Sequence, residues 1–130
     1  MARYSILIAD DDASCRETIG DTISRAGHGV VTAATGTEAI EIVSRGDHVF
    51  HATILDMFMP DLTGLQTLEA LFRIVNPFPA IFVTADESKE LLIKAMEAGA
   101  YTLLRKPLSA RLVVITVDQL LRKYYGSSGN

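Results

Sequence analysis

The sequence has a single cysteine, no tryptophan and fewer basic than acidic residues among its 130 positions. One cysteine cannot form an internal disulfide, which excludes a disulfide-stabilised secreted domain and makes a reducing cytoplasm the expected location. The net charge of −4 does not favour binding to nucleic acid or to a membrane surface through bulk charge. We therefore expect a cytoplasmic protein whose partners are proteins or small ligands.

Long hydrophobic runs are also absent. The longest uninterrupted apolar runs have four residues, at Ile6–Ala9, Ala80–Val83 and Leu112–Ile115, whereas a membrane-spanning helix needs about 20. The segment Met1–Ser5 lacks the apolar stretch of a signal peptide. We expect no membrane segment, and 48% hydrophobic residues suffice for the core of one domain of ordinary size.

Short apolar runs rich in isoleucine, valine and leucine alternate with segments of helical periodicity. The predicted strands are Ile6–Ala9, Gly29–Ala33, Ala52–Leu55, Ala80–Val83 and Thr102–Leu104. The predicted helices are Ser14–Arg25, Thr37–Ser44, Leu65–Val75, Ser88–Ala98 and Ser109–Tyr124. Strands without polar alternation are covered on both faces, so the pattern predicts an α/β fold with a doubly wound, five-stranded parallel sheet and five helices. The predicted domain spans 4–125, and 126–130 has the composition of a flexible tail or linker.

Polar residues follow four of the five predicted strands. They are Asp10, Asp11 and Asp12 after the first strand, Asp56 after the third, Thr84 after the fourth and Lys106 after the fifth. Ligands of doubly wound sheets bind outside the carboxyl ends of the strands. Adjacent carboxylates such as Asp10 and Asp11 repel each other, and a hard divalent cation removes that repulsion. Together with Asp56 they predict a Mg²⁺ site, whereas Asp12 is expected to cap the first helix.

Asp56 ends the central strand, where we expect its carboxylate to stand exposed beside the acidic pair. A carboxylate in this place is either a metal ligand only or a nucleophile that forms an aspartyl phosphate. Thr84 and Lys106 bring a hydroxyl and an ammonium group to the same edge of the sheet. Both are donors for phosphoryl oxygens, so they favour the phosphate hypothesis.

The cysteine and the histidines do not suggest further chemistry. Cys15 precedes Ile19 and Ile23 at spacings of four, which predicts core packing in a helix rather than a reactive thiol. The three histidines lie at uneven spacings without a partner cysteine, so we expect surface or loop roles and no zinc site. They are His28, His48 and His51.

With these residues placed, the sequence resembles the receiver domain of two-component response regulators, over about residues 4–125. The likeness rests on five segments in order: Ile6–Asp12, Leu55–Leu65, Val83–Ala85, Ala98–Ala100 and Lys106–Pro107. The resemblance implies a flavodoxin-like fold with strand order 2-1-3-4-5. It also implies a cis peptide bond before Pro107.

The resemblance further implies roles for the strand-end residues. Asp56 would accept a phosphoryl group from a histidine kinase. Asp10 and Asp11 would hold Mg²⁺ with Asp56, and the backbone carbonyl of Phe58 would complete the protein ligands. Thr84 and Lys106 would contact the phosphoryl oxygens. The chain would then be a signalling phosphoacceptor rather than an enzyme, apart from Mg²⁺-dependent self-phosphorylation and self-dephosphorylation.

The resemblance also implies partners and an output surface. The partners would be a sensor histidine kinase or phosphotransfer protein and a downstream target or output domain. The output surface would be the fourth helix, fifth strand and fifth helix, which would change on phosphorylation. Leu103 stands where the family commonly has an aromatic switch residue, and Tyr101 lies two positions away. The apolar residues of 112–117 exceed one helix face, so some should remain exposed and could support a homodimer.

Two other functions fit parts of the pattern. In a phosphatase of the haloacid dehalogenase type, Asp10 would be the nucleophile, but such enzymes need an acidic pair after the lysine. Only Asp118 follows Lys106, within a predicted helix. A pseudo-receiver that binds partners without phosphorylation is the other alternative, although every predicted site position holds a chemically competent residue.

Overall fold

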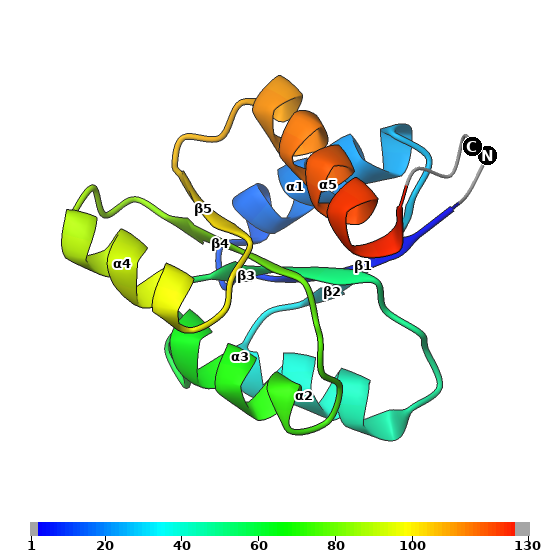
Figure 1. The fold of residues 1–130 in the computed structure, drawn as a ribbon, viewed down its shortest axis with the longest axis horizontal. Coiled ribbons are helices and arrows are strands. Elements are labelled where there is room, and N and C mark those ends of the chain that lie inside the picture. Colours follow the sequence, from blue (N-terminus) through cyan, green and yellow to red (C-terminus); the bar gives the residue numbers. More distant parts are fainter. Residues whose placement is uncertain (1–2, 127–130) are drawn as a thin grey trace.

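The computed structural model describes residues 3–126, in which five strands alternate with five helices (Figure 1). In chain order the elements are β1 (Ser5–Ala9), α1 (Ala13–Arg25), β2 (Gly29–Ala33), α2 (Gly36–Arg45), β3 (Ala52–Asp56), α3 (Gly64–Phe72), β4 (Ala80–Thr84), α4 (Lys89–Glu97), β5 (Thr102–Arg105) and α5 (Ala110–Tyr125). Of the predicted tail at 126–130, residues 127–130 lie outside the described part.

The five strands form one parallel sheet in the order β2-β1-β3-β4-β5, which confirms the predicted topology. Figure 1 shows α1 and α5 on one face of this sheet and α2 and α3 on the other. Successive strand residues point to opposite faces. Ile6 and Ile8 accordingly join the core beneath α1 and α5, while Leu7 and Ala9 join the core beneath α2, α3 and α4. The apolar strands without alternation are thus explained by two covered faces.

Side-chain caps fix where the helices start. Asp12 accepts hydrogen bonds from the amides of Ser14 and Cys15, which confirms its predicted capping role. Thr63 and Gln66 form a reciprocal capping box at the start of α3. The loop from β1 to α1 is short, whereas the loop from β3 to α3 spans residues 57–63.

Some element ends differ from the prediction. Helix α3 ends at Phe72 rather than Val75, because the chain continues there as a turn in which the Arg73 amide donates to Ala70 and the Ile74 amide to Leu71. Strands β3 and β4 continue one residue further than predicted, so Asp56 and Thr84 are the last residues of these strands rather than the first residues after them. The predicted cis peptide bond before Pro107 is confirmed.

Candidate metal centre

Three carboxylates meet at the carboxyl edge of the sheet. Asp10 directly follows β1 and Asp56 ends β3, and these strands are hydrogen-bonded neighbours with Ala9 opposite Leu55. One oxygen from each of Asp10, Asp11 and Asp56 lies within 4.8 Å of the others. The predicted acidic cluster therefore forms in the folded chain.

The three carboxylates differ in depth. Asp10 is 1% exposed and Asp56 is 7% exposed, whereas Asp11 is exposed. The prediction that Asp56 stands exposed is wrong. Strand β3 lies between β1 and β4, and the loop behind it folds back so that the Gly64 amide donates to the Met57 carbonyl. Asp10 and Asp56 thus form the floor of the centre and Asp11 forms its rim.

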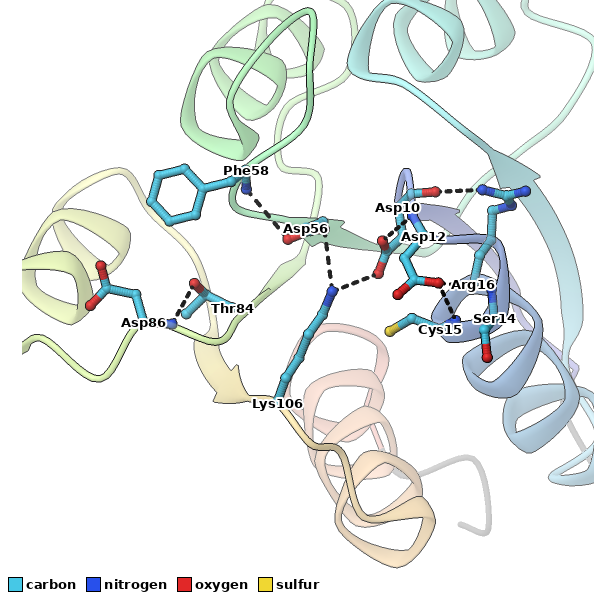
Figure 2. Close-up of polar contacts among 10 residues, drawn as sticks. All are labelled: Asp10, Asp12, Ser14, Cys15, Arg16, Asp56, Phe58, Thr84, Asp86 and Lys106. Atoms are coloured by element: carbon cyan, nitrogen blue, oxygen red, sulfur yellow. Dashed lines mark hydrogen bonds and ion pairs between the residues drawn. The ribbon is translucent and has the colours of Figure 1, made fainter.

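Lys106 reaches this floor from the loop after β5 (Figure 2). Its Nζ lies 3.2 Å from Asp10 Oδ2 and 3.3 Å from Asp56 Oδ2. One ammonium group therefore faces two buried carboxylates, with Asp11 nearby, and leaves an excess of negative charge. Buried charge without full compensation is costly, which makes this edge receptive to a cation.

The surroundings shift the pKa values of the two buried carboxylates in opposite directions. Burial, the charge of Asp10 and a hydrogen bond with Asp10 raise the pKa of Asp56 to about 6. Burial also opposes ionisation of Asp10, but hydrogen bonds from the Asp12 amide and the Cys15 thiol outweigh it and lower the pKa of Asp10. Burial disfavours the Lys106 charge too, yet the charges of Asp56 and Asp10 raise the pKa of Lys106 above its ordinary value.

The donor set fits a hard divalent cation. All the acidic ligands are carboxylate oxygens, which Mg²⁺ prefers. Asp10 Oδ2 is buried and accepts no hydrogen bond from the chain over residues 3–126, although Lys106 Nζ is near it. The Phe58 amide lies 3.3 Å from Asp56 Oδ1, which puts the Phe58 main chain beside the centre. Asp10, Asp11 and Asp56 are therefore the groups that could hold the ion, and the Phe58 carbonyl as a further ligand stays a prediction.

Thr84 is at the predicted edge but its hydroxyl is engaged elsewhere. The residue is buried at the end of β4, one position beyond Val83, which is opposite Asp56 in the sheet. Thr84 Oγ1 accepts a hydrogen bond of 3.1 Å from the Asp86 amide (Figure 2). The structure thus brings together Asp10, Asp56 and Lys106, with Thr84 on the neighbouring strand end.

Two residues of α1, Cys15 and Arg16, lie against Asp10, and neither contact was predicted from the sequence. The Arg16 guanidinium donates a 2.7 Å hydrogen bond to the Asp10 carbonyl. Cys15 packs against the core as predicted, and burial together with the neighbouring Asp10 carboxylate raises the pKa of Cys15 to about 11. The capping residue Asp12 fixes where α1 starts. The short spacing from Asp12 to Cys15 and Arg16 is therefore the sequence feature that could have placed both residues beside Asp10.

Part of the apolar surface of α5 remains outside the core, as predicted: Leu112 is 47% exposed and Ile115 is 42% exposed. Ile115 lines a hollow with Thr22 and Arg25 of α1, so it faces α1 rather than α4 and β5. Leu103 is buried in β5, and Tyr101 is half-buried with Lys123 Nζ 5.5 Å from its ring centre. Asp118, the acid that the phosphatase hypothesis would need, pairs on α5 with Arg122 and is outside the carboxylate group.

A parallel five-stranded sheet with this acidic centre defines a doubly wound α/β domain that binds ligands at its carboxyl edge. A family model described as the response regulator receiver domain matches residues 6–118. The chain belongs to this family. None of the helices within 3–126 is long and apolar enough to cross a membrane.

Curated relatives carry the same domain within longer proteins. Response regulator MprA of Mycobacterium leprae is 33% identical over 118 residues, which cover 91% of this chain and 51% of that protein. A cyclic di-GMP phosphodiesterase of Thermotoga maritima is 29% identical over 119 residues, which cover 91% of this chain and 31% of that protein. The chain thus spans about half of the first relative and less of the second.

Solved structures of receivers share the fold. Chemotaxis protein CheY4 of Vibrio cholerae has 29% identity and a TM-score of 0.85, with 92% of this chain and 100% of that chain covered. The beryllofluoride-activated NtrC4 receiver domain dimer has 26% identity and a TM-score of 0.85, with coverage of 92% and 98%. The flavodoxin-like receiver fold is therefore shared along nearly the whole chain.

Proposed function

We propose that this domain accepts a phosphoryl group on Asp56 from a histidine kinase or a phosphotransfer protein, in a reaction that requires Mg²⁺. The observation that carries the proposal is that two buried carboxylates share one ammonium group: Lys106 Nζ lies 3.3 Å from Asp56 Oδ2 and 3.2 Å from Asp10 Oδ2. This arrangement supplies negative ligands for a cation and a positive partner for a phosphoryl oxygen within one small volume.

The chemistry follows from the charges at the centre. When bound, Mg²⁺ neutralises the carboxylates and coordinates a phosphoryl oxygen. An Asp56 oxygen attacks phosphorus, the bond from phosphorus to the donor breaks, and the donor leaves with that bonding pair. Lys106 then loses an anionic partner at Asp56 and pairs with the transferred group instead, while Asp10 stays ionised. Thr84 lies at the end of the adjacent strand, and its hydroxyl oxygen accepts from the Asp86 amide, which leaves its O–H free to donate to the same group.

The proposed output is a change of the surface formed by α4, β5 and α5. Thr84 leads directly into the loop before α4, and Lys106 leads into the loop before α5. A new bond at either residue would therefore change the position of the loop that leads to this surface. The exposed residue Leu112 of α5 suits contact with a downstream target, an output domain or a second copy of the chain. Light-scattering mass with and without beryllofluoride distinguishes the second copy from the other partners.

Intact mass tests the proposal directly. Incubation with Mg²⁺ and acetyl phosphate is expected to add about 80 Da, the mass of one phosphoryl group. Asp56→Asn removes the nucleophile and is expected to show no addition, and so is the native chain with excess chelator. Addition to the Asp56→Asn variant, or none to the native chain with either acetyl phosphate or a phosphorylated kinase, contradicts the proposal. If the native chain gains no phosphoryl group but still binds a partner, the result supports the pseudo-receiver alternative.

A further inference from the structure

The loop that follows Asp56 is tied to the start of α2 by one carboxylate, that of Asp61. Asp61 Oδ2 accepts a 2.8 Å hydrogen bond from the Thr37 amide, and Oδ1 accepts one of 3.2 Å from the Gly36 amide. The Leu62 amide also donates to Oδ1, at 2.7 Å. A single side chain thus joins the loop after β3 to a separate helix.

We propose that Asp61 is a positioning residue for the metal centre, because it holds the loop in the conformation that presents the Phe58 carbonyl beside Asp56. This inference rests on the proposed function. Asp61 itself does not contact the centre. It acts through the main chain between Phe58 and Leu62.

The rest of the loop shows why this tie matters. At one end, the Met57 amide donates to Val83 and the Met57 carbonyl accepts from Gly64, so the loop leaves β3 from a fixed point. The Phe58 amide then donates to Asp56, which is itself the reactive carboxylate. Pro60 has no amide hydrogen to donate. Within residues 58–62, the hydrogen bonds to another element are those of Asp61, in a structure described over 3–126.

The start of α2 is a suitable anchor. The first amides of a helix have no intrahelical acceptors, and the positive end of the helix dipole favours a carboxylate. A Cβ atom at Gly36 would collide with Thr67 of α3, so α2 and α3 approach too closely for the helix start to shift freely. The Thr37 hydroxyl, despite some opposing burial, and the backbone donors hold the pKa of Asp61 well below its ordinary value. Asp61 therefore stays ionised whenever the centre can bind a cation.

Glu38 offers a matched control at the same end of α2. Its carboxylate accepts a 2.6 Å hydrogen bond from the Ala34 amide, and it is exposed like Asp61. Glu38→Ala removes one negative charge and one capping bond from this helix start without touching the loop after β3. Any general effect of charge or helix stability on cation binding will appear in Glu38→Ala as well.

The experiment compares Asp61→Ala, Asp61→Asn and Glu38→Ala in the full chain, with the Mg²⁺ dissociation constant measured by calorimetry and stability measured by denaturant unfolding. We expect Asp61→Ala to weaken Mg²⁺ binding by about fivefold, a small effect for a group that supports metal ligands indirectly. Asp61→Asn should recover part of the loss, because its amide oxygen still accepts a hydrogen bond. Glu38→Ala should bind Mg²⁺ like the native chain even if it is equally destabilised.

An unchanged dissociation constant in Asp61→Ala, or an equal loss in Glu38→Ala, would overturn the positioning role. Failure of the native chain to bind Mg²⁺ is a different result, since it contradicts the proposed metal centre itself.

Discussion

The two ends of the same sheet are built in opposite ways. At the carboxyl ends of the strands, Asp10 and Asp56 are buried with one Lys106 between them. At the amino ends, the chain places aromatic rings: Tyr4, His28, His51 and Tyr125. The first end buries carboxylates that share a single ammonium group, whereas the second end packs rings against one another.

The polar groups of the amino end find partners within the chain. The Ser5 amide donates to His51 Nδ1 at 2.9 Å, and the His51 amide donates to the Ser5 carbonyl at 2.8 Å. The Tyr125 hydroxyl donates to the His51 carbonyl at 2.6 Å, and the Tyr4 ring packs 5.0 Å from the His51 ring. Within residues 3–126, these groups of the amino end satisfy one another. At the carboxyl end, by contrast, two buried carboxylates share one ammonium group, which is the kind of environment found at functional sites.

The largest expected effect comes from removing a buried ligand at the carboxyl end. Asp10→Asn deletes one negative charge next to the cation, and we expect the Mg²⁺ dissociation constant to rise at least tenfold, equivalent to about 1.4 kcal/mol. Asp118→Asn removes an equal charge from the exposed pair with Arg122 and serves as the control. Calorimetric titration measures both. Equal Mg²⁺ affinity in the two variants would mean that the buried carboxylate of Asp10 contributes no more to cation binding than the exposed carboxylate of Asp118.

The second prediction concerns metal-free stability. Burial and the Asp10 charge raise the pKa of Asp56 to about 6, so ionised Asp56 destabilises the folded state. The free energy of unfolding of the native chain should fall as pH rises from about 4 through 6. Asp56→Asn removes this cost and should be more stable by about 1–3 kcal/mol at pH 7.5, but not below pH 4. Denaturant unfolding with chelator measures the difference, and a destabilised variant at pH 7.5 would contradict it.

At the amino end, Tyr125→Phe removes the hydrogen bond to the His51 carbonyl. We expect a loss of about 0.5–1 kcal/mol in the free energy of unfolding, because the tyrosine is partly exposed. Tyr124→Phe is the control, since no hydrogen bond of that hydroxyl is found in residues 3–126. Mg²⁺ affinity should be native in both variants. A change in Mg²⁺ affinity for Tyr125→Phe would mean that the two ends are coupled.

The smallest predicted effect is a pH dependence at His28. Burial lowers the pKa of His28 and outweighs the opposite effect of Asp118, while the charges of Arg3 and His51 act with it. Its neutral Nδ1 accepts from the Tyr4 amide, so stability should be lost as pH falls below about 6.5. His28→Asn keeps an acceptor and should flatten this loss by a few tenths of a kcal/mol. Unfolding curves at pH 5 and 7.5 test it, and an unchanged slope would contradict the role of His28.

Much of the fold was predictable because it depends on local patterns. The runs without polar alternation, as at Ile6–Ala9, indicate strands covered on both faces, and two covered faces imply parallel strands with helices on each side. The carboxyl ends of such strands share one edge, so the order of strands and polar residues along the chain is enough to bring Asp10, Asp56 and Lys106 together.

The rest depends on contacts between distant residues, which no local pattern reports. The burial of Asp56 follows from the position of β3 in the middle of the sheet. The bond from Ser5 to His51 joins residues 46 positions apart, and that from Gly36 to Asp61 joins residues 25 apart. Histidines that look like loop residues in the sequence therefore become structural acceptors in the fold.

Reductive trapping tests the central assignment most directly. Borohydride converts an aspartyl phosphate into homoserine, so the modified peptide becomes lighter by about 14 Da than the unmodified one. After phosphorylation with Mg²⁺ and acetyl phosphate, we predict this change in the peptide that contains Asp56 and at no other position. Trapping at Asp10 or Asp11 instead would contradict the account and would favour the phosphatase alternative for Asp10.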